Sequence, residues 1–449
     1  MNPPLRGASV IGGRLELSRR RLLGLTGMAA LTLGLSACGS GSKGGGGGDG
    51  KTLSVLFPQT HAGASEILKK EFEQRTGATV NVTLVPYDQL QQKATLDVQS
   101  GAAEFDVFDS WYVSVGALAE GGIIDPLDDL LGDTNVDTGD FIPSIYDAYS
   151  LYQGKRYGLP FDGDTQVLFY NREILDRNGV APPATWDQYA AAVKKITQAE
   201  SGRGVYGAAL MAQKAPIILG STYANRLAGF GGTFLNADGS AALDSAAALG
   251  AAQALLEVVP HALPTPAETA FDQALAAFLG GQVAFMEFWT DLGVFAEDPS
   301  KSKIQGKWGV VTLPTGGSAT KSVAALDAGF CLNVSSAAPN KELAQQFVTF
   351  ATSRETNLRL ITTTGSGIDP NRRSTLSAAE YRTFAPQVQA VATASLDGAL
   401  VWPTSPQSPV LMQSLSDALA AMIAGNSTPE SALRSTQTEW ERIIGRPAR

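Results

Sequence analysis

Three short stretches of the 449-residue sequence place carboxylates beside an aromatic ring or a glycine: Asp109-Ser110-Trp111, Asp162-Gly163-Asp164 and Trp289-Thr290-Asp291. A carboxylate accepts charge-assisted hydrogen bonds, which are stronger than those between neutral groups. An aromatic ring offers a flat apolar surface at a small entropic cost. Together these groups suit the recognition of a small molecule that carries both hydroxyl groups and C–H faces. The same carboxylates could instead act in pairs, as they do in glycoside hydrolysis.

The composition argues against several other kinds of chemistry. His61 and His261 are the only histidines of the sequence, which argues against a histidine-built metal site and against a histidine-dependent catalytic triad. The formal net charge is -9, whereas nucleic-acid affinity comes from lysine and arginine neutralising phosphates. We therefore expect no catalytic residues, no metal, no cofactor and no nucleic-acid partner.

Residues 1–37 have the pattern of an export signal. Arg19, Arg20 and Arg21 precede an uncharged apolar run over 22–37, which is shorter than the roughly 20 residues of a spanning helix. The sequence SRRRLL around these arginines resembles the twin-arginine export motif, although an ordinary basic segment looks similar. The route of export, twin-arginine or general secretory, stays open.

The sequence LSAC over 35–38 resembles the bacterial lipobox. This motif predicts cleavage before Cys38 and a lipid on Cys38 that anchors the chain to the outer face of the cytoplasmic membrane. Residues 38–50 are rich in Gly and Ser and are expected to form a flexible tether. The other cysteine, Cys331, lies in an apolar stretch and is expected to be a small buried core residue.

From residue 51 onward, strand patterns alternate with helix patterns. Strands are predicted over 51–57, 79–87 and 105–111, and helices over 62–77 and 88–102. A β-α-β-α-β order builds a parallel sheet, and ligands bind at the carboxyl ends of its strands. Because single cores stop growing at about 250 to 300 residues, two lobes are expected.

Four stretches resemble, in the same order, the extracellular solute-binding proteins, family 1, which are carbohydrate-binding receptors of ABC importers; they cover 157–197, 271–293, 327–353 and 363–376. One departure is that PQTHAG after the first strand lacks a tryptophan common in the family. The resemblance implies an α/β, two-lobed periplasmic-binding-protein fold with three interlobe crossings (type II-like) that closes by a hinge on its ligand. Its predicted lobe 1 comprises 51–161 and 320–366, and its lobe 2 comprises 162–319 and 367–449.

The resemblance also implies which residues meet the ligand. The ligand-binding candidates are Asp109, Trp111, Asp162, Asp164, Trp289, Asp291 and Trp402. Core packing is the alternative role for the two tryptophans Trp289 and Trp402, and an Asp beside Gly, such as Asp164, commonly caps a turn. The hinge candidates are Gly163, Gly365 and Gly367, since glycine absorbs backbone rotation at little cost.

The implied function is a lipid-anchored, monomeric receptor, not an enzyme, that captures a carbohydrate or polyol and delivers it to the permease of an ABC transporter. The alternatives are a glycerophosphodiester receptor of the same family and an exported carbohydrate-active enzyme. A structural or adhesive lipoprotein is a third class. Arg372 and Arg373 are the only arginine pair near the proposed crossings, and we expect both to be solvated at the flank of the hinge, which disfavours a phosphorylated ligand.

Overall fold

A computed structural model describes residues 51–132, 136–396 and 398–445. The export signal, Cys38 and the whole tether lie outside these residues. All the described residues belong to the unit Gly46–Arg449 of the chain. No helix within them is long and apolar enough to cross a membrane.

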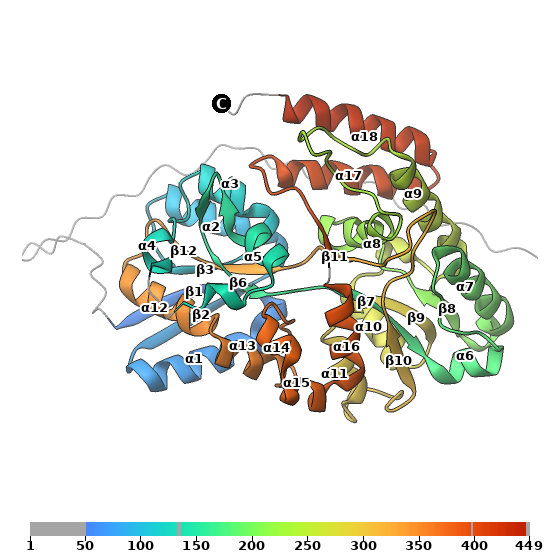
Figure 1. Ribbon diagram of the computed structural model, residues 1–449, viewed down its shortest axis with the longest axis horizontal. Helices are drawn as coiled ribbons and strands as arrows, with labels where there is room; N and C mark the ends of the chain where they lie inside the picture. The colour runs from blue at the N-terminus through green and yellow to red at the C-terminus, as the bar shows by residue number, and fades with distance from the viewer. Residues whose placement is uncertain (1–50, 133–135, 397, 446–449) are drawn as a thin grey trace, which may run out of the picture. The chain divides into compact units, whose positions relative to one another are not determined.

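The first sheet has the strand order β2-β1-β3-β12-β6 (Figure 1). Its strands are β1 (Thr52–Pro58), β2 (Thr79–Val85), β3 (Val107–Trp111), β6 (Leu159–Asp162) and β12 (Phe330–Val334). β1 pairs in parallel with β2 and β3, while β12 pairs antiparallel with β3 and β6. Helices α1 (Ala62–Thr76) and α2 (Leu90–Gln99) connect the three parallel strands. The predicted β-α-β-α-β order is therefore confirmed.

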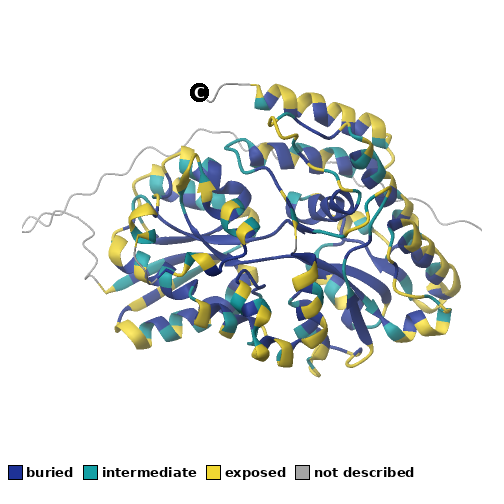
Figure 2. Cartoon of the chain, in the orientation of Figure 1, coloured by how far each residue is buried: buried dark blue, intermediate teal, exposed yellow. Residues whose placement is uncertain are grey.

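The second sheet has the order β10-β7-β9-β8. Its strands are β7 (Gln166–Asn171), β8 (Tyr206–Ala209), β9 (Val283–Trp289) and β10 (Trp308–Val311). Around it lie α6 (Arg172–Asn178), α7 (Trp186–Glu200), α8 (Ser221–Gly229), α9 (Ala246–Val258), α10 (Phe271–Leu279) and α11 (Leu292–Glu297). α7 packs against β8, and α10 packs against β9. Most residues of both large sheets are buried, and the surrounding helices expose mainly one face (Figure 2).

The remaining elements complete the two halves. Near the first sheet lie α3 (Val115–Glu120), α4 (Asp128–Leu131), α5 (Pro143–Ser150), α12 (Lys341–Ala351) and α13 (Arg354–Ile361). The chain then continues through α14 (Arg373–Ser377), α15 (Ala379–Phe384), α16 (Pro386–Ser395), α17 (Ser408–Ile423) and α18 (Pro429–Ile444). Small two-stranded sheets join β4 (Leu151–Tyr152) with β5 (Lys155–Arg156) and β11 (Ala324–Leu326) with β13 (Ala399–Val401).

The chain passes from the first large sheet to the second and back again. β6 of the first sheet ends at Asp162 and β7 of the second begins at Gln166, so only residues 163–165 lie between them. The chain returns between β10 and β12. α16, which follows α14 and α15, packs against β10. The count of three crossings and the bounds of the lobes stay predictions.

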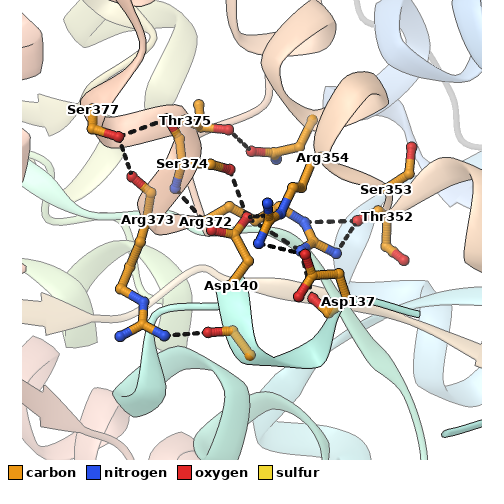
Figure 3. A network of polar contacts seen from close by, with 12 residues as sticks. Asp137, Asp140, Thr352, Ser353, Arg354, Arg372, Arg373, Ser374, Thr375 and Ser377 are labelled. Carbon is orange, nitrogen blue, oxygen red and sulfur yellow. Dashed lines mark hydrogen bonds and ion pairs between the residues drawn. The ribbon is translucent and has the colours of Figure 1, made fainter. Parts of the chain in front are cut away.

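Arg372 and Arg373 follow the last predicted crossing, and both were expected to be exposed to solvent. Arg373 is exposed, but Arg372 is only 1% exposed, so its assignment as a solvated flank is wrong. Arg372 donates through Nε, at 2.9 Å, and through a terminal nitrogen to the Thr352 carbonyl oxygen (Figure 3). Its guanidinium group lies 3.8 Å from the centre of the Phe141 ring. It also reaches a carboxylate oxygen of Asp140 at 3.4 Å.

These contacts supply the physical reason for the burial of Arg372. Asp140 and Phe141 come from a segment more than 200 residues earlier in the chain, and they provide the counter-charge and the aromatic surface that a buried guanidinium group requires. Ser374 also donates to Asp140 through its backbone N–H, at 3.0 Å, and through its hydroxyl group. The start of α14 is thereby tied to the half of the molecule built on the first sheet.

Cys331 is a free cysteine buried in β12, as predicted. Burial raises the pKa of its thiol well above the ordinary value. A thiol held in its protonated form is a poor nucleophile, so Cys331 is a packing residue.

Candidate functional site

A cavity of about 200 Å³ lies between the ends of strands from the two large sheets. Its acidic and basic lining residues are His61, Asp162, Asp164, Asp272, Asp291 and Asp369. Its aromatic lining residues are Tyr87, Phe271, Phe288, Trp289, Phe295 and Phe330, and Gly365 and Gly367 line it as well. Among the lining residues there is no lysine and no arginine.

His61 forms a buried charged group with two aspartates at the first sheet. Its Nδ1 is 2.6 Å from a carboxylate oxygen of Asp109, and its Nε2 is 3.1 Å from one of Asp162. Burial lowers the pKa of His61, but Asp109 and Asp162 outweigh it and raise that pKa to about 10. The imidazole is therefore protonated at neutral pH, and both of its nitrogens donate to carboxylates. Its one positive charge is committed to these two partners.

Asp164 and Asp369 bring further carboxyl groups to the cavity. They are 7% and 4% exposed. The backbone N–H of Asp369 donates to Asp162 at 2.6 Å, and the Thr290 hydroxyl group donates to the Asp369 carboxylate. Burial and the neighbouring aspartates raise the pKa of both Asp164 and Asp369 well above the ordinary value. Asp164 also has φ +36°, which is the left-handed turn conformation, so it serves the turn as well as lining the cavity.

Trp289 is the last residue of β9 and lines the cavity. Its ring packs against Phe271 with 4.9 Å between centroids, and its Nε1 donates to a carboxylate oxygen of Asp327 at 3.1 Å. The residue is 5% exposed. The sequence left cleft and core as alternatives for Trp289, and the structure combines them, because one buried ring contacts both the core and the cavity.

The other candidates lie away from this cavity. Asp109 lies behind His61 and is fully buried. Trp111 packs edge-to-face on Trp402 with 5.8 Å between ring centroids, and its Nε1 donates to the Asp327 carbonyl oxygen at 2.9 Å. Trp402 is 1% exposed and also contacts Phe234. Neither tryptophan lines the cavity, so the structure does not bring them together with Asp162, Asp164, Trp289 and Asp291.

The three predicted hinge glycines have different physical roles. Gly365 and Gly367 have φ +81° and +70°, a region that other residues adopt only with strain. Gly163 does not have a positive φ, but a Cβ there would lie 2.0 Å from the Pro370 carbonyl oxygen. Gly163 is therefore required for a close approach between two chain segments. Whether the three glycines also rotate on closure stays a prediction.

Three functional candidates were not identified from the sequence: His61, Asp327 and Asp369. The position of PQTHAG after the first strand was the available signal for His61, and the resemblance offered none because the family's tryptophan is missing there. Asp327 and Asp369 lie in two of the stretches that carry the resemblance, 327–353 and 363–376. Nothing in those segments alone distinguishes them from the many surface aspartates of the chain.

Several buried acceptors in and around the cavity have no hydrogen-bond partner. They are one carboxylate oxygen each of Asp109, Asp291 and Asp327. Buried polar groups are normally paired, because an unpaired one costs free energy. No cluster of three or more potential metal-ligating side chains occurs among the described residues. Of these three residues only Asp291 lines the cavity, so its unpaired oxygen is the acceptor that a hydrogen-bond donor of an organic ligand can satisfy.

Comparison with known proteins gives consistent results. The family model for bacterial extracellular solute-binding proteins matches residues 57–357. A binding protein of Brucella abortus (strain 2308) is 26% identical over 386 residues, covering 84% of this chain and 89% of its own length. The erythritol/L-threitol-binding protein of Mycolicibacterium smegmatis is 25% identical over 414 residues, covering 83% and 85% of the two chains.

The crystal structure of an ABC transporter solute-binding protein from Agrobacterium radiobacter K84 in complex with ribitol has a TM-score of 0.79 to this chain. It is 24% identical and covers 88% of this chain and 99% of its own. This similarity confirms the predicted α/β, two-lobed fold of periplasmic solute-binding proteins.

Proposed function

Because the chain belongs to the bacterial extracellular solute-binding protein family, we propose that it is a receptor that captures a carbohydrate or polyol between its lobes and delivers it to the permease of an ABC transporter. The observation that carries this proposal is the cavity itself. Asp162 from the first sheet and Trp289 from the second line it together. Carboxylates accept hydrogen bonds from hydroxyl groups, and the indole offers a surface for C–H faces.

The ligands of similar proteins agree with this chemistry. The relative from Mycolicibacterium smegmatis is named for erythritol and L-threitol, and the structure from Agrobacterium radiobacter K84 holds ribitol. The residues that we assign to ligand contact are Asp162, Asp164, Trp289 and Asp291. We assign Gly163, Gly365 and Gly367 to the hinge.

The alternatives of the sequence analysis are less well supported. A glycerophosphodiester carries a negative charge, which the lining carboxylates would repel, and no lysine or arginine lines the cavity to compensate it. Arg372, one of the two arginines near the proposed crossing, is committed to Asp140 and Thr352. An exported glycosidase would use the same acids, and it would convert a sugar that binds.

A thermal-shift screen tests the receptor function. The panel comprises erythritol, ribitol, mannitol, maltose and a glycerophosphodiester, because a ligand that binds only the folded state raises its melting temperature. A polyol or sugar should raise it, and chromatography should recover that ligand chemically unchanged after incubation. Conversion of the ligand would instead support the enzyme, and a shift with the glycerophosphodiester alone would support the phosphorylated ligand.

The lipid anchor is a separate part of the proposal and rests on LSAC over 35–38. Substitution Cys38→Ala should remove the acylation site and either release the chain from the membrane or leave it unprocessed. Fractionation of cells followed by mass determination of the N-terminus measures both. A cleaved Cys38→Ala product that stays with the membrane would contradict the lipobox assignment.

A further inference from the structure

We infer that the ligand carries a positively charged amine beside its hydroxyl groups, as an amino sugar or an amino polyol does. This inference rests on the proposed receptor function and narrows its ligand class. It follows from the charges that line the cavity, from their unpaired acceptors and from the aromatic rings around them.

The lining residues include several acidic side chains that have no basic partner. His61 is its only basic side chain, and both of its ring nitrogens are already committed to Asp109 and Asp162. Asp164, Asp291 and Asp369 line the same cavity and lack any such partner of opposite charge there. Buried carboxylates are stabilised by a nearby cation and destabilised by one another. Burial and mutual repulsion raise the pKa of these groups and favour their protonated, neutral form. A neutral polyol leaves that form in place, whereas a cation stabilises the ionised form.

Unpaired acceptors mark the positions where donors are missing. One carboxylate oxygen of Asp291 is shielded from solvent and has no hydrogen-bond partner. Asp327 is fully buried, accepts a hydrogen bond from the Trp289 indole and does not line the cavity, so its other oxygen is not a ligand contact. An ammonium group carries three donors and a positive charge, so it can pair with Asp291 and with a neighbouring carboxylate of the lining at once.

The aromatic lining fits the same ligand. Phe271, Phe288, Trp289 and Phe295 all border the cavity. A cation near an aromatic ring is attracted by the ring's quadrupole, most strongly by that of tryptophan. The cavity therefore combines an acidic wall with aromatic surface and no competing basic side chain among its lining residues.

The protonation of the lining carboxyl groups is consistent with this arrangement. Burial and the neighbouring Asp162 raise the pKa of Asp291 to about 7, with His61 opposing the shift. Burial and the charges of Asp162, Asp369, Asp327 and Asp291 raise the pKa of Asp164, and burial with Asp291 and Asp162 raises that of Asp369. Tyr381 of α15 is the further titratable group near Asp369. A cationic ligand should displace protons from these carboxyl groups, whereas a neutral polyol should not.

Calorimetric titration with matched ligands tests the inference. Sorbitol, glucamine and gluconate share a six-carbon polyhydroxylated chain and differ at one terminal carbon, which carries a hydroxyl group, an ammonium group or a carboxylate group. The same comparison uses ribitol and erythritol with their 1-amino-1-deoxy derivatives, so that chain length is sampled. At the length that binds best, the amine should bind at least about tenfold more tightly than the neutral polyol, about 1.4 kcal/mol, and gluconate should bind least.

Proton release provides a second readout. Binding of the amine should release protons, detected as a dependence of the heat on the ionisation enthalpy of the buffer. Its affinity should increase as the pH rises past the pKa of about 7 of Asp291. A neutral polyol that binds as tightly as its amine overturns the inference and leaves the receptor function intact.

The remaining outcomes distinguish a failure of the amine inference from a failure of the receptor function. Putrescine, a diamine without hydroxyl groups, should bind more weakly than the amino polyols; if it binds more tightly, the carbohydrate or polyol function itself is wrong. Binding of no sugar, polyol or amine overturns both proposals. The panel thus distinguishes a failed inference from a failed function.

A variant tests whether Asp291 causes the preference for the amine over the neutral polyol. Asp291→Asn removes a negative charge and keeps nearly the same shape, so it should reduce the affinity ratio of amine to neutral polyol by several fold. Asp187→Asn, at an exposed position in the first turn of α7, makes the same change of net charge away from the cavity and should leave the ratio unchanged. The ratio compares two ligands on one folded variant, so a general loss of stability does not imitate the effect. An unchanged ratio in Asp291→Asn would contradict the assignment.

Discussion

His61 lies between the Asp109 and Asp162 carboxylates and is 2% exposed. A buried ion pair contributes little net stability compared with apolar packing, but removal of one partner leaves the other charge uncompensated. Removal of His61 would leave two carboxylates uncompensated, because its single imidazolium contacts both. We therefore expect removal of His61 to reduce the stability of the fold more than it reduces ligand affinity.

The first prediction concerns that removal. His61→Gln should lower the free energy of unfolding by about 3 to 5 kcal/mol, measured by urea unfolding. Arg75→Gln removes one partner of the exposed pair with Glu355 and should cost less than about 1 kcal/mol. Adding Asp109→Asn to His61→Gln should recover part of the loss, as a double-mutant cycle would show. Equal costs for His61→Gln and Arg75→Gln would contradict the buried ion pair.

Trp289 gives the second prediction at the residue scale. Trp289→Phe keeps a ring but loses the hydrogen bond to Asp327 and part of the cavity wall, so it should weaken ligand binding and lower stability. Trp440→Phe loses a comparable buried indole hydrogen bond, to the Leu411 carbonyl oxygen, away from the cavity. Trp440→Phe should therefore lower the stability of the protein with little change in its affinity for the ligand.

Trp289→Ala should cost about 2 kcal/mol or more in binding, which is typical of a central aromatic anchor and corresponds to roughly thirtyfold in Kd. Calorimetry with the ligand found by the screen measures the affinity, and the melting temperature measures the stability. If the Trp289 and Trp440 variants lose affinity equally, Trp289 is a core residue only.

At the scale of elements, the short passage from β6 to β7 depends on the absence of a side chain at Gly163. A Cβ there would approach the Pro370 carbonyl oxygen at 2.0 Å and the Asn371 nitrogen at 3.0 Å. Both neighbours are backbone atoms, which cannot rotate away as a long side chain can. The passage after β6 and the segment before α14 are therefore packed directly against each other.

The third prediction follows from this contact. Gly163→Ala should lower the free energy of unfolding by about 1 to 3 kcal/mol, the usual cost of an extra methyl group in a tightly packed region, and it should weaken ligand binding because Asp162 and Asp164 flank the position. Gly202→Ala, where a Cβ would meet nothing within 4 Å, should stay within about 0.5 kcal/mol of the parent. Urea unfolding and calorimetric titration measure the two effects. A Gly163→Ala protein of unchanged stability would show that the segments separate readily.

At the scale of the whole molecule, the buried acids determine how stability depends on pH. Burial raises the pKa of Asp109 to about 6 and those of Asp291 and Asp327 to about 7, whereas an unfolded Asp titrates near about 3.9. Between these values the folded protein binds more protons than the unfolded chain, so its stability falls as the pH rises. His61 acts in the same direction. Its stabilising contribution is complete below about pH 6.5 and is lost as the pH rises toward its folded pKa of about 10.

The fourth prediction is that the ligand-free protein melts at a higher temperature near about pH 5 than near about pH 8, by the equivalent of a few kcal/mol, since one pKa unit corresponds to about 1.36 kcal/mol. The pKa of Asp140 is lowered by its bonds to Ser374 and by Arg354 and Arg372, so Asp140 is ionised in both the folded and the unfolded state over this pH range and does not change the trend. Scanning calorimetry over this pH range measures it. Asp291→Asn should flatten the slope, and a melting temperature that rises steadily with pH would contradict the assigned protonation of the cavity.

The sequence by itself determined the parts of this protein that depend on neighbours along the chain. The alternation of Val80 and Val82 predicted β2, and helical spacing with a terminal Gly77 predicted α1. Both follow from the repeat of side-chain direction within one element. The apolar run that ends at Trp289 is typical of a buried strand, as β9 is, and four local stretches identified the family.

Only the tertiary structure decided which of the candidate residues meet. His61 pairs with Asp109 from 48 positions away, and Trp289 pairs with Asp327 from 38 positions away. Trp402, which the resemblance placed in the cleft, is buried against Trp111 outside the cavity. A local pattern specifies which face of an element is buried, but it does not specify which distant side chain will lie against it. Whether an aspartate is a surface charge, half of an ion pair or an unpaired acceptor depends on packing between segments far apart in the chain, and so do its pKa and its affinity for a ligand.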